Sequence, residues 1–177
     1  LIRLLSSGAM TALIYRFRFL LSLSLLTSPG AFGEGPAPDR RGQAVPDRSF
    51  DIQSLVLDLD LDPDEETVEG SASYQIQRLG SGDFVLDQVG LDIRTVRVDG
   101  EEAPWWIQGQ HLHIEVDGSN ANVVIEYRAK PDAGLHFRHG DRSTVDTFDE
   151  VWSQGQKNDN RYWIPCWDHP NDRFLYE

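Results

Sequence analysis

The sequence predicts an all-β fold, an antiparallel β-sandwich, and three observations support this. Apolar and polar residues alternate with a period of two from Phe50 onward. Tight-turn signals such as Asp99-Gly100 recur between the alternating segments. No segment combines a sustained helical period with end caps. Short strands joined by tight turns are typical of sandwiches.

The first two expected strands form a hairpin. In "SLVLDLDLD", residues 54–62, the leucines share one face and the aspartates the other. After a turn that contains Pro63, the segment "TVEGSASYQIQRL" places four apolar residues on one side: Val68, Ala72, Tyr74 and Ile76. Two alternating segments on either side of a turn predict a hairpin.

Five further strands are expected at short spacing: "FVLDQV", "LDIRTVRV", "APWWIQ", "HLHIEV" and "NVVIEYRA". With the hairpin they give about seven antiparallel strands, enough for two packed sheets. Beyond Pro131 the alternation fades, and Pro131 to Glu150 is expected to be a long surface connection.

The first 33 residues predict a signal peptide, with Met10 as a plausible start. Arg16 and Arg18 supply positive charge, Phe19 to Leu26 an apolar run, and Ala31-Phe32-Gly33 a cleavage site. The apolar run is shorter than the roughly 20 residues of a membrane span, so no stable span is expected. The protein is therefore expected to be exported, periplasmic or extracellular. An N-terminal anchor and a mistranslated upstream region are the alternatives.

Residues 34–49, "EGPAPDRRGQAVPDRS", have no apolar period and predict a disordered linker before a domain at 50–177. The net charge is −13, and the first 33 residues hold three arginines and no acid, so the remainder carries −13 − 3 = −16. An acidic chain of this kind lacks the basic footprint that nucleic acid requires, and it is disfavoured on anionic lipid.

Three groups of side chains invite a binding hypothesis. The acidic run from Asp58 to Glu66 suggests calcium, but it lacks the spacing of an EF-hand and fits a solvated sheet face better. His111 and His113, two apart on one strand, would need a third ligand to hold zinc and are expected to be exposed. Of Trp105 and Trp106, one is expected in the core and the other on the surface, where it would offer a sugar-stacking platform.

The residues alone give no complete catalytic constellation. The sequence has no H-E-x-x-H, no G-x-S-x-G and no phosphate loop. Its single cysteine, Cys166, lies in an aromatic setting without a histidine pattern that would activate it. A buried, inert thiol is expected there.

The segment "WSQGQKNDNRYWIPCWDHPNDR", residues 152–173, closely resembles the end of the first domain of the aminopeptidase N family of zinc metallopeptidases. The family pattern is T-Q-x-[EQ] followed by R-x-x-x-P-C-x-D-x-P, which matches Ser153 to Gln156 and Arg161 to Pro170. "GLHF" at Gly134 to Phe137 is similar to the family's Gly-Leu-aromatic turn. With the opening hairpins in matching order, the resemblance covers residues 50–177.

This resemblance implies a saddle-like β-sandwich that caps a thermolysin-like catalytic domain. That second domain would carry the H-E-x-x-H zinc site and a Gly-x-Met-x-Asn loop, so the zinc ligands of the full-length enzyme lie outside this chain. The zinc polarises the scissile carbonyl and activates water. The substrate is a peptide held by its free N-terminus.

The resemblance assigns substrate contacts to Gln154 and Gln156. The Gln156 carbonyl oxygen would accept a hydrogen bond from the substrate ammonium, and Gln154 would line the pocket for the first side chain. Residues two apart in an extended backbone point the same way, so both amides are expected to face one cleft. Gly155 between them allows close backbone approach.

A second set of motif residues is expected to be scaffold: Arg161, Pro165, Cys166, Asp168 and Pro170. The prolines favour extended geometry in the residues before them. These residues are expected to form a bend from Arg161 to Pro170. Arg161 and Asp168 are expected to pair beneath this bend and to hold the segment Gln154 to Gln156, the glutamine element, in place.

The sequence ends at Glu177, before the remaining strands and the catalytic domain that the family implies. The chain alone is therefore expected to be inactive as a peptidase and to bind no catalytic zinc. Two alternatives remain open: an exported, non-catalytic β-sandwich binding module, and a family relative that serves as an interaction scaffold.

Overall fold

The computed structural model describes residues 15–16, 46–140, 150–156 and 158–176, and the expected signal peptide and linker lie almost wholly outside them. Within the described residues the chain is all-β, as predicted, with one short 3-10 helix and no α-helix. No helix in this described part is long and apolar enough to cross a membrane.

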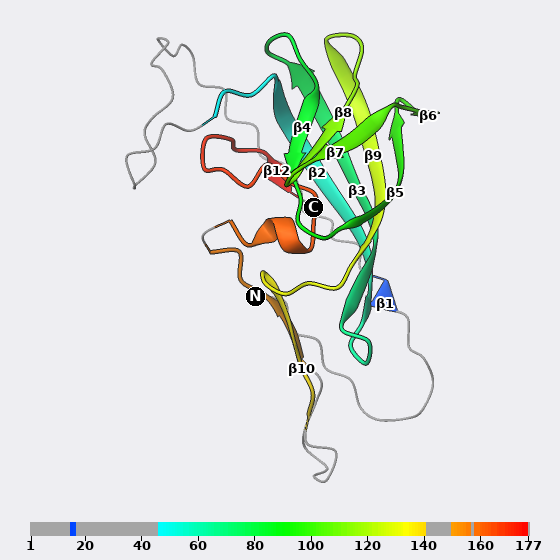
Figure 1. The fold of residues 1–177 in the computed structure, drawn as a ribbon, viewed down its shortest axis with the longest axis vertical. Coiled ribbons are helices and arrows are strands. Elements are labelled where there is room, and N and C mark those ends of the chain that lie inside the picture. The colour runs from blue at the N-terminus through cyan, green and yellow to red at the C-terminus, as the bar shows by residue number, and fades with distance from the viewer. Residues whose placement is uncertain (1–14, 17–45, 141–149, 157, 177) are drawn as a thin grey trace.

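The larger layer is a seven-stranded sheet, in which the strands follow the order β1-β2-β3-β9-β5-β6 and β12 (Leu175–Tyr176) also pairs with β2 (Figure 1). Its other members are β1 (Tyr15–Arg16), β2 (Phe50–Asp62), β3 (Thr67–Arg78), β9 (Asn120–Ala129), β5 (Asp92–Val98) and β6 (Glu101–Glu102). The β2–β3 hairpin pairs from Phe50 with Arg78 to Asp62 with Thr67, which confirms the first predicted pair. Asp99 and Gly100 both have positive φ, at 51° and 93°, and turn β5 into β6 as the Asp-Gly signal predicts.

The second layer is a three-stranded sheet in the order β4-β8-β7, formed by β4 (Phe84–Asp87), β8 (His111–Ile114) and β7 (Trp105–Gln108). It lies over one end of the large sheet (Figure 1). The core fills the space between the layers, and its largest buried side chains include Tyr74, Tyr127, Leu86 and Ile125. All four residues expected on the apolar side of β3 are buried.

One prediction for the chain beyond Pro131 is wrong in part. Leu135–Arg138 is strand β10, and it pairs antiparallel with β11, Glu150–Ser153. Leu135 and Val151 are buried in the core, so this hairpin is anchored to the sandwich and is not only a surface connection. Residues 141–149 between the two strands lie outside the described part.

The last segment crosses the sandwich and ends beside β2. The 3-10 helix η1 (Asn160–Tyr162) leads to Cys166, which forms an antiparallel bridge with Asp87 at the edge of β4. Strand β12 (Leu175–Tyr176) then pairs with Ser54 and Leu55 of β2, the one parallel pair among the described strands. Figure 1 shows this segment, orange to red, lying against β4 and β2.

Candidate functional site

The glutamine element, Gln154-Gly155-Gln156, directly follows β11 and is exposed along its length. The backbone N–H of Gln154 donates a 2.7 Å hydrogen bond to the Gly134 carbonyl oxygen. Gly134 therefore fixes the start of the element from the side of β10. That both amides face one cleft stays a prediction.

Gly134, the first residue of the "GLHF" turn, is tightly enclosed. Its φ is +78°, which L side chains rarely adopt, and a Cβ there would lie 2.7 Å from the Asp159 carbonyl carbon and 2.9 Å from Cδ1 of Trp163. Only glycine fits between β10 and the start of η1. The close contact brings the glutamine element and η1 together at one end of the hairpin.

Gly155 is exposed but has the Asn160 side chain against one side. A Cβ on Gly155 would lie 2.6 Å from Cγ of Asn160, well inside van der Waals contact. The Asn160 Nδ2 group in turn donates to Oδ1 of Asp168 at 3.3 Å. The glutamine element thus rests on a side chain that the bend holds in place.

Arg161 and Asp168 pair beneath the bend, as the scaffold hypothesis expects. The Arg161 Nε lies 3.4 Å from Oδ2 of Asp168, and the Arg161 backbone N–H donates to the same oxygen at 3.3 Å. The carboxylate therefore binds both the main chain and the side chain of one residue. Such charge-assisted bonds are about twice as strong as neutral ones.

Two of the other scaffold residues, Pro165 and Cys166, also join the bend to the sandwich. The buried Tyr74 hydroxyl donates to the Pro165 carbonyl oxygen. Cys166 exchanges two backbone hydrogen bonds with Asp87, at 2.7 and 3.0 Å. Pro170 is exposed at the following turn.

Cys166 is buried and chemically quiet, as predicted. Burial first, and then the negative charges of Asp168 and Asp87, raise the pKa of its thiol well above the ordinary value. A thiol in this state is neutral and is a poor nucleophile. Cys166 therefore belongs to the scaffold.

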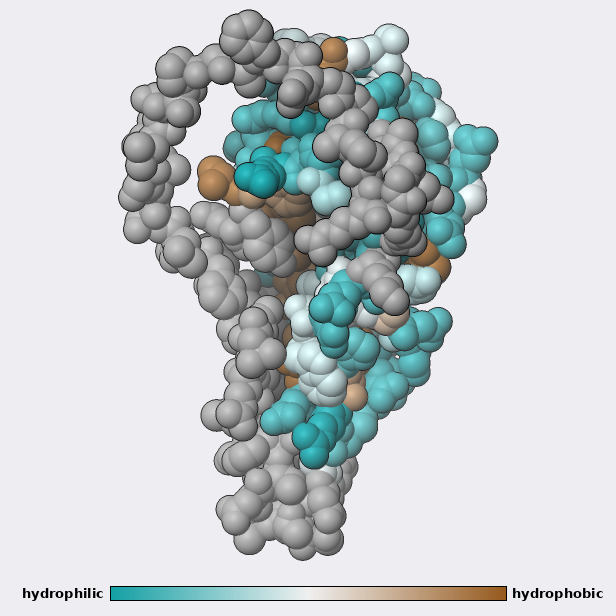
Figure 2. Space-filling view, turned by 90° about the vertical axis from the view of Figure 1, so that its left-hand side faces the viewer, coloured by the Kyte–Doolittle hydropathy of each residue, from teal (hydrophilic) through white to brown (hydrophobic). Residues whose placement is uncertain are grey.

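A recess of about 350 Å³ lies beside the glutamine element. Its walls combine apolar side chains with the polar groups of Ser153, Asn160 and Asp168. This size and mixture of groups are typical of ligand sites and of docking sites for another part of a protein. Figure 2 shows hydrophobic side chains reaching the surface in the middle of one face of the molecule, between hydrophilic ones.

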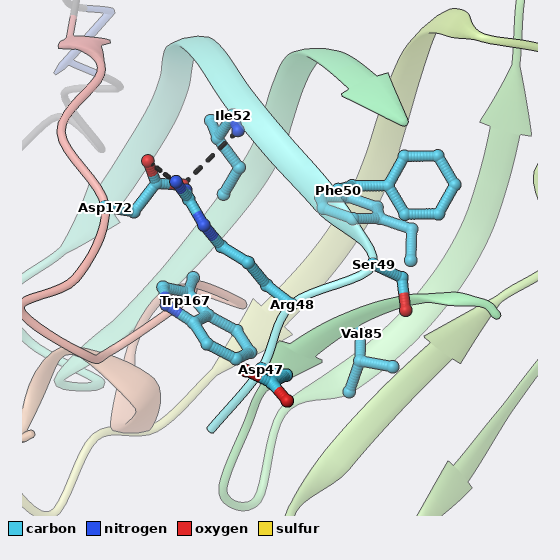
Figure 3. A pocket seen from close by; sticks show the side chains of 9 residues that line it. Asp47, Arg48, Ser49, Phe50, Ile52, Val85, Trp167 and Asp172 are labelled. Atoms are coloured by element: carbon cyan, nitrogen blue, oxygen red, sulfur yellow. Dashed lines mark hydrogen bonds and ion pairs between the residues drawn. The ribbon is translucent and has the colours of Figure 1, made fainter. Parts of the chain in front are cut away.

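A second cavity, of about 40 Å³, has room for a few waters but not for a substrate (Figure 3). The Arg48 guanidinium reaches across it to the Asp172 carboxylate, which also accepts from the Ile52 N–H at 3.3 Å. Arg48 lies in residues 46–49, the part of the expected linker that the structure describes. The cavity therefore lies beside an ion pair, the Arg48–Asp172 clasp, which joins the start of the domain to its last described segment.

The histidines and tryptophans singled out in the sequence lie on the neighbouring strands β7 and β8. Trp105 packs on the core and Trp106 is 38% exposed, so the expected division between core and surface is confirmed. Trp106 stacks on His113 at 5.1 Å between ring centroids, and His111 is exposed on the same strand. Among the described residues no three His, Cys, Asp or Glu side chains converge as metal ligands.

Asp87 is the residue of this region that the sequence analysis missed. It is 2% exposed, and it meets the bend through its backbone and its carboxylate. Its strand pattern suggests a solvated polar residue, because the segment that covers it lies about 80 positions further along the chain. No local signal could have identified it.

The two-layer β-sandwich, with its Gly-Leu turn, glutamine element and proline-cysteine bend, agrees with the resemblance to the first domain of zinc metallopeptidases. The chain belongs to the Peptidase M1 N-terminal domain family, whose model matches residues 48–177.

Relatives and solved structures agree with this family. "Probable aminopeptidase 2" of Sulfurisphaera tokodaii is 28% identical over 92 residues, which is 50% of this chain and 11% of that protein. The native LTA4 hydrolase of yeast has a similar fold, with a TM-score of 0.67 and 23% identity over 79% of this chain and 25% of that chain. An M1 zinc metallopeptidase of Deinococcus radiodurans, solved with a Tyr-Ser-Ala substrate, also has a similar fold. Its TM-score is 0.57 and its identity 20%, over 73% of this chain and 32% of that chain. The chain thus spans a third or less of each of these proteins.

Proposed function

We propose that this chain is the N-terminal substrate-capping domain of an exported zinc aminopeptidase, which removes N-terminal amino acids from peptides. The observation that carries the proposal is the exposed glutamine element, fixed by Gly134 on one side and by Asn160 on the other. The family match and the aminopeptidase names of its relatives support it.

In this proposal the domain binds and orients the free amine of the peptide. The Gln156 carbonyl oxygen accepts a hydrogen bond from the substrate ammonium, and Gln154 lines the pocket for the first side chain. A hydrogen bond from a charged group contributes about 1.5–3 kcal/mol. Because an amide is neutral, an acid of the catalytic domain would supply the remaining charge complementarity.

Zinc chemistry belongs to the catalytic domain. The described residues of this chain bring no metal-ligand set together, so they do not fit a zinc site. This chain's contribution is the wall of the amine pocket, while the partner domain supplies the metal and its water. The 350 Å³ recess, lined by Ser153 and Asn160 on either side of the element in the sequence, has room for a segment from the rest of the enzyme.

The proposal is tested by following the reading frame beyond Glu177 and assaying its product on an aminoacyl p-nitroanilide. We expect a downstream H-E-x-x-H and activity that a chelator abolishes, while the 177-residue chain alone is inactive. Chelator-sensitive release of the chromophore by the 177-residue chain alone would contradict the proposed division of labour.

Export is part of the same proposal and has its own test. If residues 1–33 are a signal peptide, the mature protein begins near Glu34. N-terminal sequencing of the protein recovered from the periplasm or the medium would show this. Recovery of the uncleaved chain from the cytoplasm would contradict it.

An exported, non-catalytic binding module is the second candidate, and the exposed Trp106 favours it. The Trp106 indole stacks on the His113 imidazole. The His113 Nδ1 lies 3.4 Å from the Asp83 carboxylate, so the indole stacks on an imidazole that is held in a fixed orientation. A rigid aromatic surface of this kind suits the apolar face of a sugar. A stop codon after Glu177, together with saccharide binding lost in Trp106→Ala, would select this candidate.

A further inference from the structure

Asp87 is a charged residue in an unusual place for a sandwich strand. Phe84 and Leu86 of β4 point into the core, so Asp87 lies on the outer face of the small sheet. It is nevertheless only 2% exposed, because the bend that contains Cys166 and Asp168 covers it. Covering an ionised carboxylate is costly unless it is paired.

The Asp87 carboxylate is met from several sides. Oδ2 accepts a 3.0 Å hydrogen bond from the Asp168 backbone N–H, and Oδ1 lies 3.4 Å from Nη1 of Arg161. The Nε2 atoms of His111 and His169 lie 3.5 and 3.4 Å away. The carboxylate therefore joins β4 and β8 to the bend at two places, at Arg161 and at Asp168 with His169.

A continuous set of contacts leads from Asp87 to the glutamine element. Asp87 holds Arg161 and the backbone of Asp168, and these two residues pair with each other. Asp168 also accepts from Asn160, whose side chain lies against Gly155. Each step is a hydrogen bond, an ion pair or a van der Waals contact, and the contacts run from the buried Asp87 to the exposed Gly155.

We propose that Asp87 is a positioning residue for the Gln154-Gly155-Gln156 element, acting through Arg161, Asp168 and Asn160. This inference deepens the proposed function and rests on it for its meaning in catalysis. Removing one partner of a buried charge pair leaves the others uncompensated, so loss of the Asp87 charge loosens the whole bend. The sandwich core, on the other face of the sheet, keeps its packing.

The test is amide hydrogen exchange, followed by NMR, on the 177-residue chain carrying Asp87→Asn, a change of nearly equal size that removes the charge and turns one acceptor oxygen into an NH2 donor. We expect exchange at the Gln154 and Asp168 amides to quicken about tenfold or more, while amides between β3 and β9 are unchanged. Asp92→Asn is the matched control, since Asp92 is largely exposed and its one ion pair is 3.8 Å long. Equal acceleration throughout the sheet, or no change at Gln154, overturns the proposal.

A second variant gives the order of the contacts. Asn160→Ala removes the last link, so Gln154 exchange quickens while Asp168 exchange stays near that of the parent. If Asp87→Asn does not fold, Arg161→Gln replaces it, with the same two amides expected to respond. Acceleration at Asp168 but not at Gln154 in that variant also overturns the proposal.

Kinetics separate this inference from the proposed function. In the enzyme encoded by the full reading frame, Asp87→Asn is expected to raise KM for an aminoacyl p-nitroanilide several-fold and to leave kcat within about twofold. Faster exchange at Gln154 with an unchanged KM would support the positioning role and contradict the substrate role of the glutamines. An unchanged exchange pattern overturns the positioning role whatever the kinetics show.

Discussion

The Asn160 side chain lies directly against Gly155. The Asn160 amide occupies the space where a side chain at 155 would begin, and it is tied to Asp168 behind it. The element expected to touch substrate is thus supported by a hydrogen-bonded side chain. Sites built in this way need no rearrangement to present their polar groups.

Gly155→Ala is expected to destabilise the domain by about 1–3 kcal/mol, because the new methyl group pushes Asn160 away from Asp168. Gly80→Ala is the control, since a Cβ there meets nothing within 4 Å. Urea unfolding of both variants gives the comparison. In the double variant Gly155→Ala, Asn160→Ala the clash is removed, so purely additive costs would contradict this account.

Asp168→Ala is expected to cost about 3 kcal/mol, because it leaves the part-buried Arg161 without this partner. For a domain of this size that loss lowers the melting temperature by roughly 10 °C. Differential scanning calorimetry provides the measurement, with Asp92→Ala as an exposed control. Equal melting temperatures for Asp168→Ala and the parent would remove the pair from the account.

Cys166 gives a prediction for alkaline pH. Because burial raises its pKa in the folded chain, the unfolded chain releases the thiol proton first as pH rises. The contribution to stability is therefore complete below about pH 8.5 and declines above it. Urea unfolding between pH 7 and 10 is expected to show a steeper loss for the parent than for Cys166→Ala. If the unfolding free energies of the parent and of Cys166→Ala fall in parallel as pH rises, folding does not raise the pKa of the thiol.

The clasp between Arg48 and Asp172 predicts that the start of the domain stabilises its last described segment. Arg48→Ala leaves the Asp172 carboxylate, whose side chain is 2% exposed, without its cation. We expect an unfolding free energy lower by about 2–4 kcal/mol and easier proteolysis near Phe174. Arg173→Ala is the matched control, because Arg173 is exposed. Equal protease resistance in the two variants would contradict the clasp.

Local pattern was enough to predict most of the fold. The alternation in β2, β3 and β9 predicted these three strands and the first hairpin, and Asp99-Gly100 predicted a turn that has positive φ. The β10–β11 hairpin was missed because each strand has only four residues and the two strands are separated by 11 positions. Short strands of this kind are defined by their packing on the core.

In the candidate site, too, some residues were predicted from the local sequence and others depend on contacts between distant segments. The motif predicted the glutamine element, whose contact with substrate stays a prediction, and the pairing of Arg161 with Asp168, which the structure confirms. The support from Asn160 and the buried charge of Asp87 depend on contacts between distant segments. A polar residue in an alternating strand predicts solvent exposure, and only the covering bend reverses that for Asp87.

The most direct test of the account compares Gln156→Ala and Gln156→Glu in the enzyme encoded by the full reading frame. Steady-state kinetics on a peptide with a free amine should show kcat/KM lowered about tenfold or more for the alanine variant and kept or raised for the glutamate variant, since a carboxylate adds an ion pair to the substrate ammonium. If both variants match the parent, the glutamine element does not bind the amine of the peptide.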